Sequence, residues 1–70
     1  MSARQLTARD LDYIRRTAQS ATRKQIADEW GRSPKTVEWR AISVAKKLGI
    51  GGNDVAAITR YAIGNGMIKL

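Results

Sequence analysis

The 70-residue sequence contains no cysteine and no histidine, and these two absences remove several classes of function. Without cysteine the chain has no disulfide bond and no thiolate metal site. Without histidine it lacks the usual general base and the commonest zinc ligand. Its six aspartate and glutamate residues show no catalytic or metal-binding spacing. We therefore expect no enzymatic activity, no cofactor and no metal site.

Long hydrophobic runs are missing as well. The opening residues, MSARQLTARD, contain no apolar segment of the kind that a signal peptide requires. No other run approaches the roughly 20 apolar residues that a membrane-spanning helix needs. The sequence therefore predicts no membrane contact, and the lack of cysteine agrees with a reducing, intracellular setting.

Positive charge is in excess. Thirteen lysine and arginine residues against six acidic ones give a net charge of +7 and a pI of about 10.6. A basic domain of this size indicates a polyanionic partner, nucleic acid first among them. The same charge also fits a domain that is simply kept soluble, so charge alone leaves both interpretations open.

Residues 22–48 predict two helices joined by a tight turn. Gly31 is expected to end the first helix, because glycine adopts a positive φ without steric cost. Ser33 is a favoured N-cap, and Pro34 suits the first position of the second helix, where its missing N–H would have no partner. A helix, a glycine turn and a capped helix in this order are typical of a helix-turn-helix.

The whole chain is predicted to be all-α, with no strand and no internal repeat. Thr7 is expected to cap the first helix and Asn53 the last. We expect one domain over residues 6–70, after a flexible lead at residues 1–5. The predicted helices span about residues 8–19, 23–30, 34–48 and 54–63.

The helix predicted at residues 34–48 has two different faces. Apolar residues at helical spacing form the face that we expect to be buried: Val37, Ala41, Val44 and Leu48. The opposite arc holds Lys35, Trp39, Ile42, Ser43 and Lys46. Thr36, Arg40 and Lys47 lie on one shoulder of this arc and Glu38 on the other. Lysine, arginine, serine and threonine together suit a DNA groove, because they bind phosphates and base edges.

The last helix is more apolar than packing on one face requires. The surplus predicts a second face that contacts another copy of the chain. The expected dimer contacts are Val55, Ile58, Thr59 and Ala62.

Four short motifs occur in register along the chain: LTARD at residues 6–10, KQIA at 24–27, SPKTV at 33–37 and KLGI at 47–50. Together they resemble the LuxR/GerE-type helix-turn-helix DNA-binding domain, whose pattern runs roughly LT-x-RE, KEIA, S-x-KTV and KLGV. The spacing holds without a gap from Leu6 to Ile50. The resemblance implies a four-helix fold of the LuxR/GerE C-terminal effector type, with residues 34–48 as the recognition helix and the last helix as the dimer helix.

The function implied is that of a sequence-specific, double-stranded DNA-binding transcription regulator, a homodimer on an operator with two half-sites. The expected location is cytoplasmic, in a bacterial or phage-type protein associated with the nucleoid, with no small-molecule ligand. The predicted base-reading residues are Lys35, Thr36, Trp39, Arg40 and Ser43. The predicted backbone contacts are Thr22, Arg23, Lys24, Lys46 and Lys47.

Two residues depart from the family pattern and support an alternative. Glu38 stands where relatives commonly carry a basic or amide residue, and Trp39 where they carry a polar one. Trp39 and Ile42 on the exposed arc also fit a protein interface, in which tryptophan is a common anchor. The alternative is a small interaction module that binds another transcription regulator or RNA polymerase through this face.

Overall fold

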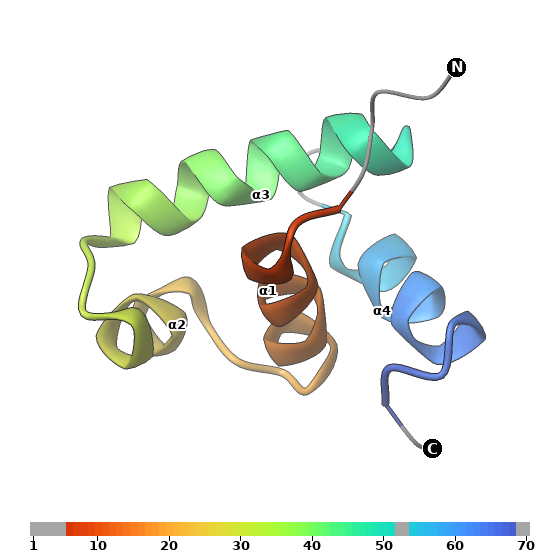
Figure 1. Cartoon of the computed structure of the whole chain (residues 1–70), viewed down its shortest axis with the longest axis horizontal. Coiled ribbons are helices and arrows are strands. Elements are labelled where there is room, and N and C mark those ends of the chain that lie inside the picture. Colours follow the sequence, from red (N-terminus) through yellow and green to blue (C-terminus); the bar gives the residue numbers. More distant parts are fainter. Residues whose placement is uncertain (1–5, 52–53, 69–70) are drawn as a thin grey trace.

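Four α-helices make up the described part of the chain, which covers residues 6–51 and 54–68 of the computed structural model (Figure 1). No strand occurs in these two ranges, which confirms the predicted all-α fold. The first helix ends one residue earlier than predicted, and the last starts and ends one residue later. The predicted lead at residues 1–5 lies outside the described residues. The helices are α1 (Ala8–Ala18), α2 (Arg23–Trp30), α3 (Pro34–Leu48) and α4 (Val55–Gly64).

Helix α1 lies at the centre of the fold. It packs against α2, α3 and α4, and α2 also packs against α3. In Figure 1, α2 and α4 lie on opposite sides of α1, and α3 crosses over one end of it. Helix α3 therefore has one face on the body of the domain and the opposite face turned outward.

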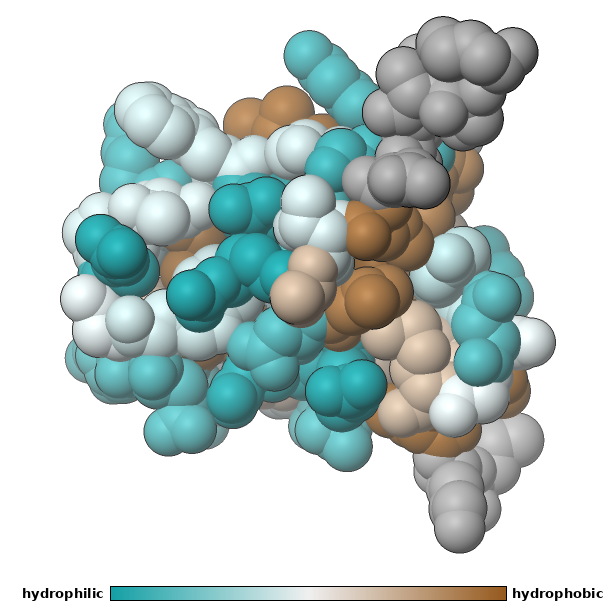
Figure 2. Space-filling view, in the orientation of Figure 1, coloured by the Kyte–Doolittle hydropathy of each residue, from teal (hydrophilic) through white to brown (hydrophobic). Residues whose placement is uncertain are grey.

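The core lies where these helices meet. The predicted buried face of α3 is confirmed, since Val37, Ala41 and Val44 are each 0% exposed and Leu48 is partly buried against them. Figure 2 shows further hydrophobic residues gathered between α1 and α4. Burying a branched aliphatic side chain contributes about 1.5–3 kcal/mol, so the burial of this cluster stabilises the fold. Its buried members are Tyr13, Ile14, Ile26, Ala27, Val37, Ala41, Val44, Ile58 and Ala62.

The first two helices each begin with a reciprocal capping box. The Thr7 hydroxyl accepts the Asp10 N–H at 3.1 Å, and the Asp10 carboxylate accepts the Thr7 N–H at 2.9 Å. Thr22 and Gln25 repeat the arrangement at α2, at 3.1 and 2.7 Å. Each box satisfies backbone donors that a helix leaves without a partner, so the chain sequence fixes both helix starts locally.

The turn between α2 and α3 begins at Gly31, which ends α2. Gly31 has φ +66° and lies in the left-handed region, as the sequence predicts. The Arg32 N–H donates to the Ala27 carbonyl at 2.9 Å, which closes the last turn of α2 in a Schellman arrangement. Pro34 then opens α3, although the Ser33 side chain makes no capping hydrogen bond. Helices α2 and α3 thus form the predicted helix-turn-helix.

The start of α4 differs from the prediction by one residue. Asp54 is the N-cap, and its carboxylate accepts the Ala57 N–H at 2.9 Å. Asn53, the predicted N-cap, lies outside the described residues. After α4 the chain turns back, and Met67 and Ile68 pack against the core. Among the described helices, none combines the length and apolarity needed to span a membrane.

Candidate nucleic-acid interface

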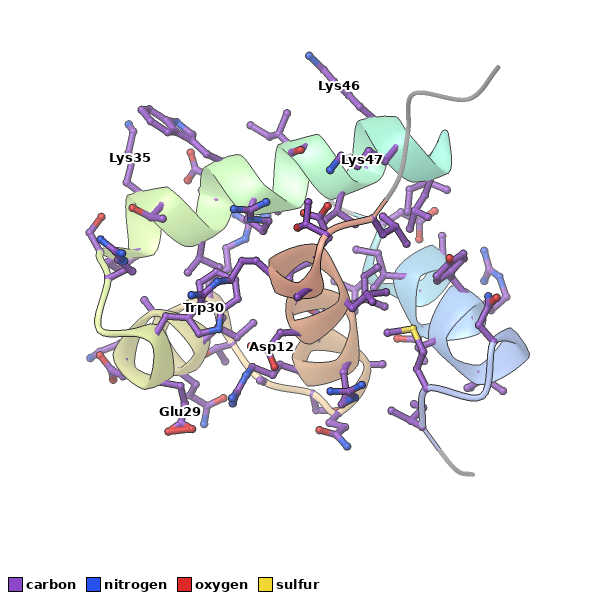
Figure 3. All side chains as sticks on the ribbon, viewed as in Figure 1. Asp12, Glu29, Trp30, Lys35, Lys46 and Lys47 are labelled. Carbon is purple, nitrogen blue, oxygen red and sulfur yellow. The ribbon has the colours of Figure 1, made fainter. Side chains whose placement is uncertain are left out.

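The outer face of α3 carries most of the predicted base-reading residues. Lys35, Thr36 and Trp39 are exposed and Ser43 is half-buried. Figure 3 shows Lys35 and Lys46 projecting from α3 away from the rest of the domain. The structure therefore places these predicted residues together on one accessible surface.

Two large apolar side chains stand in the middle of that surface. Trp39 is 65% exposed and Ile42 is 46% exposed. Trp39 is therefore not covered by α2, and Ile42 does not belong to the core. With Lys35 and Lys46 they form a stripe at positions i, i+4, i+7 and i+11, which we call the α3 stripe.

Arg40 and Lys47 are held differently from the other predicted contacts. The Arg40 guanidinium donates to Asp10 Oδ1 at 2.8 Å, and the Lys47 ammonium donates to Asp10 Oδ2 at 2.5 Å. The Asp10 side chain is 0% exposed, whereas those of Arg40 and Lys47 are 31% and 22% exposed. One buried carboxylate at the start of α1 thus holds two cations along the shoulder of α3.

These contacts decide the charge of Asp10. Burial by itself would raise the pKa of the carboxyl group. Hydrogen bonds from Lys47, from the Thr7 backbone N–H and from Arg40 outweigh it and lower the pKa from its ordinary 3.8 to about 2. Asp10 is therefore ionised at neutral pH and neutralises part of the charge that Arg40 and Lys47 bring to the shoulder.

A second polar network joins α1 to α2. The Trp30 indole N–H donates to Asp12 Oδ2 at 2.6 Å, and the Arg16 guanidinium donates to the same oxygen at 2.8 Å. Arg16 also reaches Glu29 at 3.3 Å, and the Arg9 guanidinium lies 4.6 Å from the centre of the Trp30 ring. Figure 3 shows Asp12 directed from α1 toward Trp30 on α2. This network fixes the helix that supports α3.

The predicted backbone contacts at the start of α2 belong to a different helix from the α3 stripe. Lys24 and Thr22 are exposed, and Arg23 is half-buried. Thr22 and Arg23 border a groove of about 250 Å³ whose other walls come from α1 and α4, including Tyr13 and Val55. No residue of α3 lines this groove. The groove therefore does not bring Thr22 and Arg23 together with the α3 stripe.

The predicted dimer residues of α4 divide into two pairs. Val55 is 54% exposed and Thr59 is half-buried, with its hydroxyl donating to the Val55 carbonyl at 2.9 Å. Ile58 is 1% exposed and Ala62 is 0% exposed. Because the core already encloses Ile58 and Ala62, only Val55 and Thr59 have surface to offer a second chain.

The comparison with protein families decides the classification. The sequence model of the family described as bacterial regulatory proteins, luxR family, matches residues 4–60. The chain belongs to the luxR family. No curated protein and no solved structure matches it significantly. Membership in the luxR family confirms the predicted resemblance and suggests a DNA-binding transcription regulator with a helix-turn-helix.

Sequence reasoning missed two features of this luxR-family domain. In the sequence Asp10 stands out only as the last residue of the LTARD motif, yet it pairs with Arg40 and Lys47 across the fold. Trp30 is only the last residue of the helix predicted at residues 23–30, yet its indole N–H donates to Asp12. No signal near Asp10 in the sequence indicates these partners, because Arg40 and Lys47 are 30 and 37 residues away. Among the described residues, every buried side-chain polar atom has a hydrogen-bond partner.

Proposed function

We propose that this luxR-family domain is a sequence-specific, double-stranded DNA-binding transcription regulator in which α3 enters the major groove. The observation that carries the proposal is the outward face of α3, on which exposed lysine, threonine and tryptophan residues surround one accessible helix surface. An α-helix fits the major groove, which is about 12 Å wide. The net charge of +7 favours approach to a polyanion.

The proposed DNA contacts fall into residues that face the bases and residues that bind phosphates. Lys35, Thr36, Trp39 and Ser43 face the bases in this proposal, while Lys46 and Lys24 bind phosphates. Arg40 and Lys47 keep part of their surface exposed, so each can contact DNA only from the position that Asp10 gives it. Asp10 is therefore proposed to orient two DNA contacts without touching DNA. Thr22 and Arg23 would bind the backbone beside the first turn of α2, where the positive end of the helix dipole also favours phosphate.

Dimerisation is proposed through the exposed part of α4, centred on Val55 and Thr59. Two copies joined by this face would present two α3 helices to two half-sites. Sedimentation velocity at micromolar concentration, with and without DNA, tests this. Val55→Glu should shift a dimer to monomer, and a wild-type monomer under both conditions would contradict the proposed interface.

Selection of bound sequences from a random duplex library at near-physiological salt tests the main proposal. We expect enrichment of a two-part site, and an affinity that falls with salt at a slope of about −0.9 per phosphate contact. Lys24→Ala should reduce that slope by about one without changing the selected sequence. Binding without enrichment would contradict sequence-specific recognition.

The exposure of Trp39 and Ile42 favours one second function. A free-standing apolar pair beside Glu38 also fits an interaction module that binds another transcription regulator or RNA polymerase. Trp39→Ala separates the two. Loss of binding to RNA polymerase or a regulator, with duplex affinity unchanged, would favour the module. Loss of duplex affinity would favour the DNA-binding function.

A further inference from the structure

We propose that the α3 stripe recognises the 5-methyl groups of thymine, so that each half-site contains one or two neighbouring T·A pairs read by Trp39 and Ile42. This inference rests on the proposed DNA-binding function. It names the base chemistry that the same surface selects. Its starting point is that apolar side chains occupy the middle of the stripe, where hydrogen-bonding residues would otherwise read base edges.

The spacing of the stripe fits this role. At a rise of about 1.5 Å per residue, Trp39 and Ile42 lie about 4.5 Å apart along the helix axis. Base pairs of B-DNA are stacked about 3.4 Å apart, so the two side chains meet the same or adjacent base pairs. Lys35 and Lys46 lie about 16 Å apart along the axis, one turn beyond the apolar pair at each end. Figure 3 shows both lysines directed outward from α3, away from the rest of the domain.

The surface around Trp39 has room for a base edge. Trp39, Ile42, Ser43, Lys46 and Lys47 border an open hollow of about 430 Å³. Figure 2 also shows a hydrophobic area at the outer edge of α3. A methyl group that projects from the groove floor would be buried there between the indole and the isoleucine.

The chemistry of the major groove decides which base is favoured. Thymine is the one base that presents a methyl group there. A T·A pair offers this methyl group to Trp39 and Ile42, whereas a G·C pair offers no methyl group to the same side chains. Arg40, the residue type that most often reads guanine, is held by Asp10 at the shoulder of the helix. Both observations favour T·A over G·C opposite the stripe.

Replacing thymine with uracil in the selected duplex tests the inference, because uracil lacks only the methyl group. One replacement opposite the stripe should lower the affinity of the wild-type domain about 3- to 5-fold, the value expected for one methyl group removed from an apolar contact. Trp39→Ala or Ile42→Ala should bind more weakly and lose this difference between thymine and uracil. Trp39→Phe, which keeps an aromatic surface, should retain it. Trp39 and Ile42 are exposed, so these variants should keep the helical circular dichroism of the wild type.

Lys46→Ala is the matched control on the same stripe. It should weaken binding to thymine and uracil duplexes by the same factor, because a phosphate contact does not sense the methyl group. Wild-type binding that is indifferent to every uracil replacement would overturn the inference and leave the DNA-binding function intact. An unchanged thymine preference in both alanine variants would also overturn it. Failure to select any duplex, with a protein partner lost in Trp39→Ala, would overturn the inference and the proposed function together.

Discussion

Replacing Asp10 with asparagine tests the structure most directly, because one side chain holds two cations on α3. Asparagine keeps the size of aspartate and an oxygen that can accept the Thr7 N–H, but it cannot pair with Arg40 and Lys47. Removing one member of a buried ion pair costs about 3–5 kcal/mol when the other remains buried. Here both cations are partly exposed and can regain water, so we expect Asp10→Asn to cost about 2–3 kcal/mol.

The lowered pKa of Asp10 gives a second value for the contribution of its charge to stability. Folding lowers this pKa from 3.8 to about 2, and each pKa unit corresponds to about 1.4 kcal/mol. The charged carboxylate therefore contributes about 2 kcal/mol to stability. Because the pKa of the folded state is the lower one, this contribution is complete above about pH 4. It is lost as the pH falls from about 4 to about 2. A small domain has about 0.05–0.15 kcal/mol of stability per residue, so the loss is a large part of the total.

Urea unfolding followed by circular dichroism measures both effects. Wild type and Asp10→Asn should differ by about 2–3 kcal/mol at pH 7 and converge as the pH approaches 2. The pKa of Asp12 is lowered too, against the effect of burial, by hydrogen bonds from Trp30 and Arg16. The difference between the two proteins, which share Asp12, therefore isolates Asp10. Asp28→Asn, at an exposed position of α2, is the control and should change stability little. Two results would refute the reasoning. One is the same free energy of unfolding for wild type and Asp10→Asn at pH 7. The other is a difference between them that persists at pH 2.

Two further substitutions test the helix-turn-helix. Trp30→Phe removes the hydrogen bond to Asp12 and should cost about 1–2 kcal/mol in urea unfolding; an unchanged midpoint would show that this bond adds nothing to stability. Gly31→Ala should cost about 1–2 kcal/mol from its φ of +66° alone, since an added Cβ would meet no atom within 4 Å. Gly51→Ala, which likewise meets nothing within 4 Å, is its control, and equal effects of the two would contradict the turn geometry.

Local signals predict most of the secondary structure. Thr22 with Gln25, and Gly31, mark the start and end of α2 through hydrogen bonds that span only a few residues. The buried face of α3 follows from the spacing of its apolar residues alone. These features depend on near neighbours, so they can be recognised in the sequence.

Contacts across the fold could not be predicted in the same way. Arg40 and Lys47 are 30 and 37 residues from Asp10, and the sequence gives no register between α1 and α3 that would pair them. The sequence likewise does not show which apolar residues of α4 are buried. Spacing alone does not show that Ile58 and Ala62 fill the core while Val55 remains exposed.

The placement of the two tryptophans gives the domain two separate optical reporters. Trp30 lies between α1 and α2, hydrogen-bonded to Asp12, so its emission follows the integrity of the fold. Trp39 is 65% exposed on α3, so its emission follows what occupies that face. The chain contains no other tryptophan. Single-tryptophan variants at these positions therefore allow unfolding and occupancy of α3 to be recorded separately, without an added label.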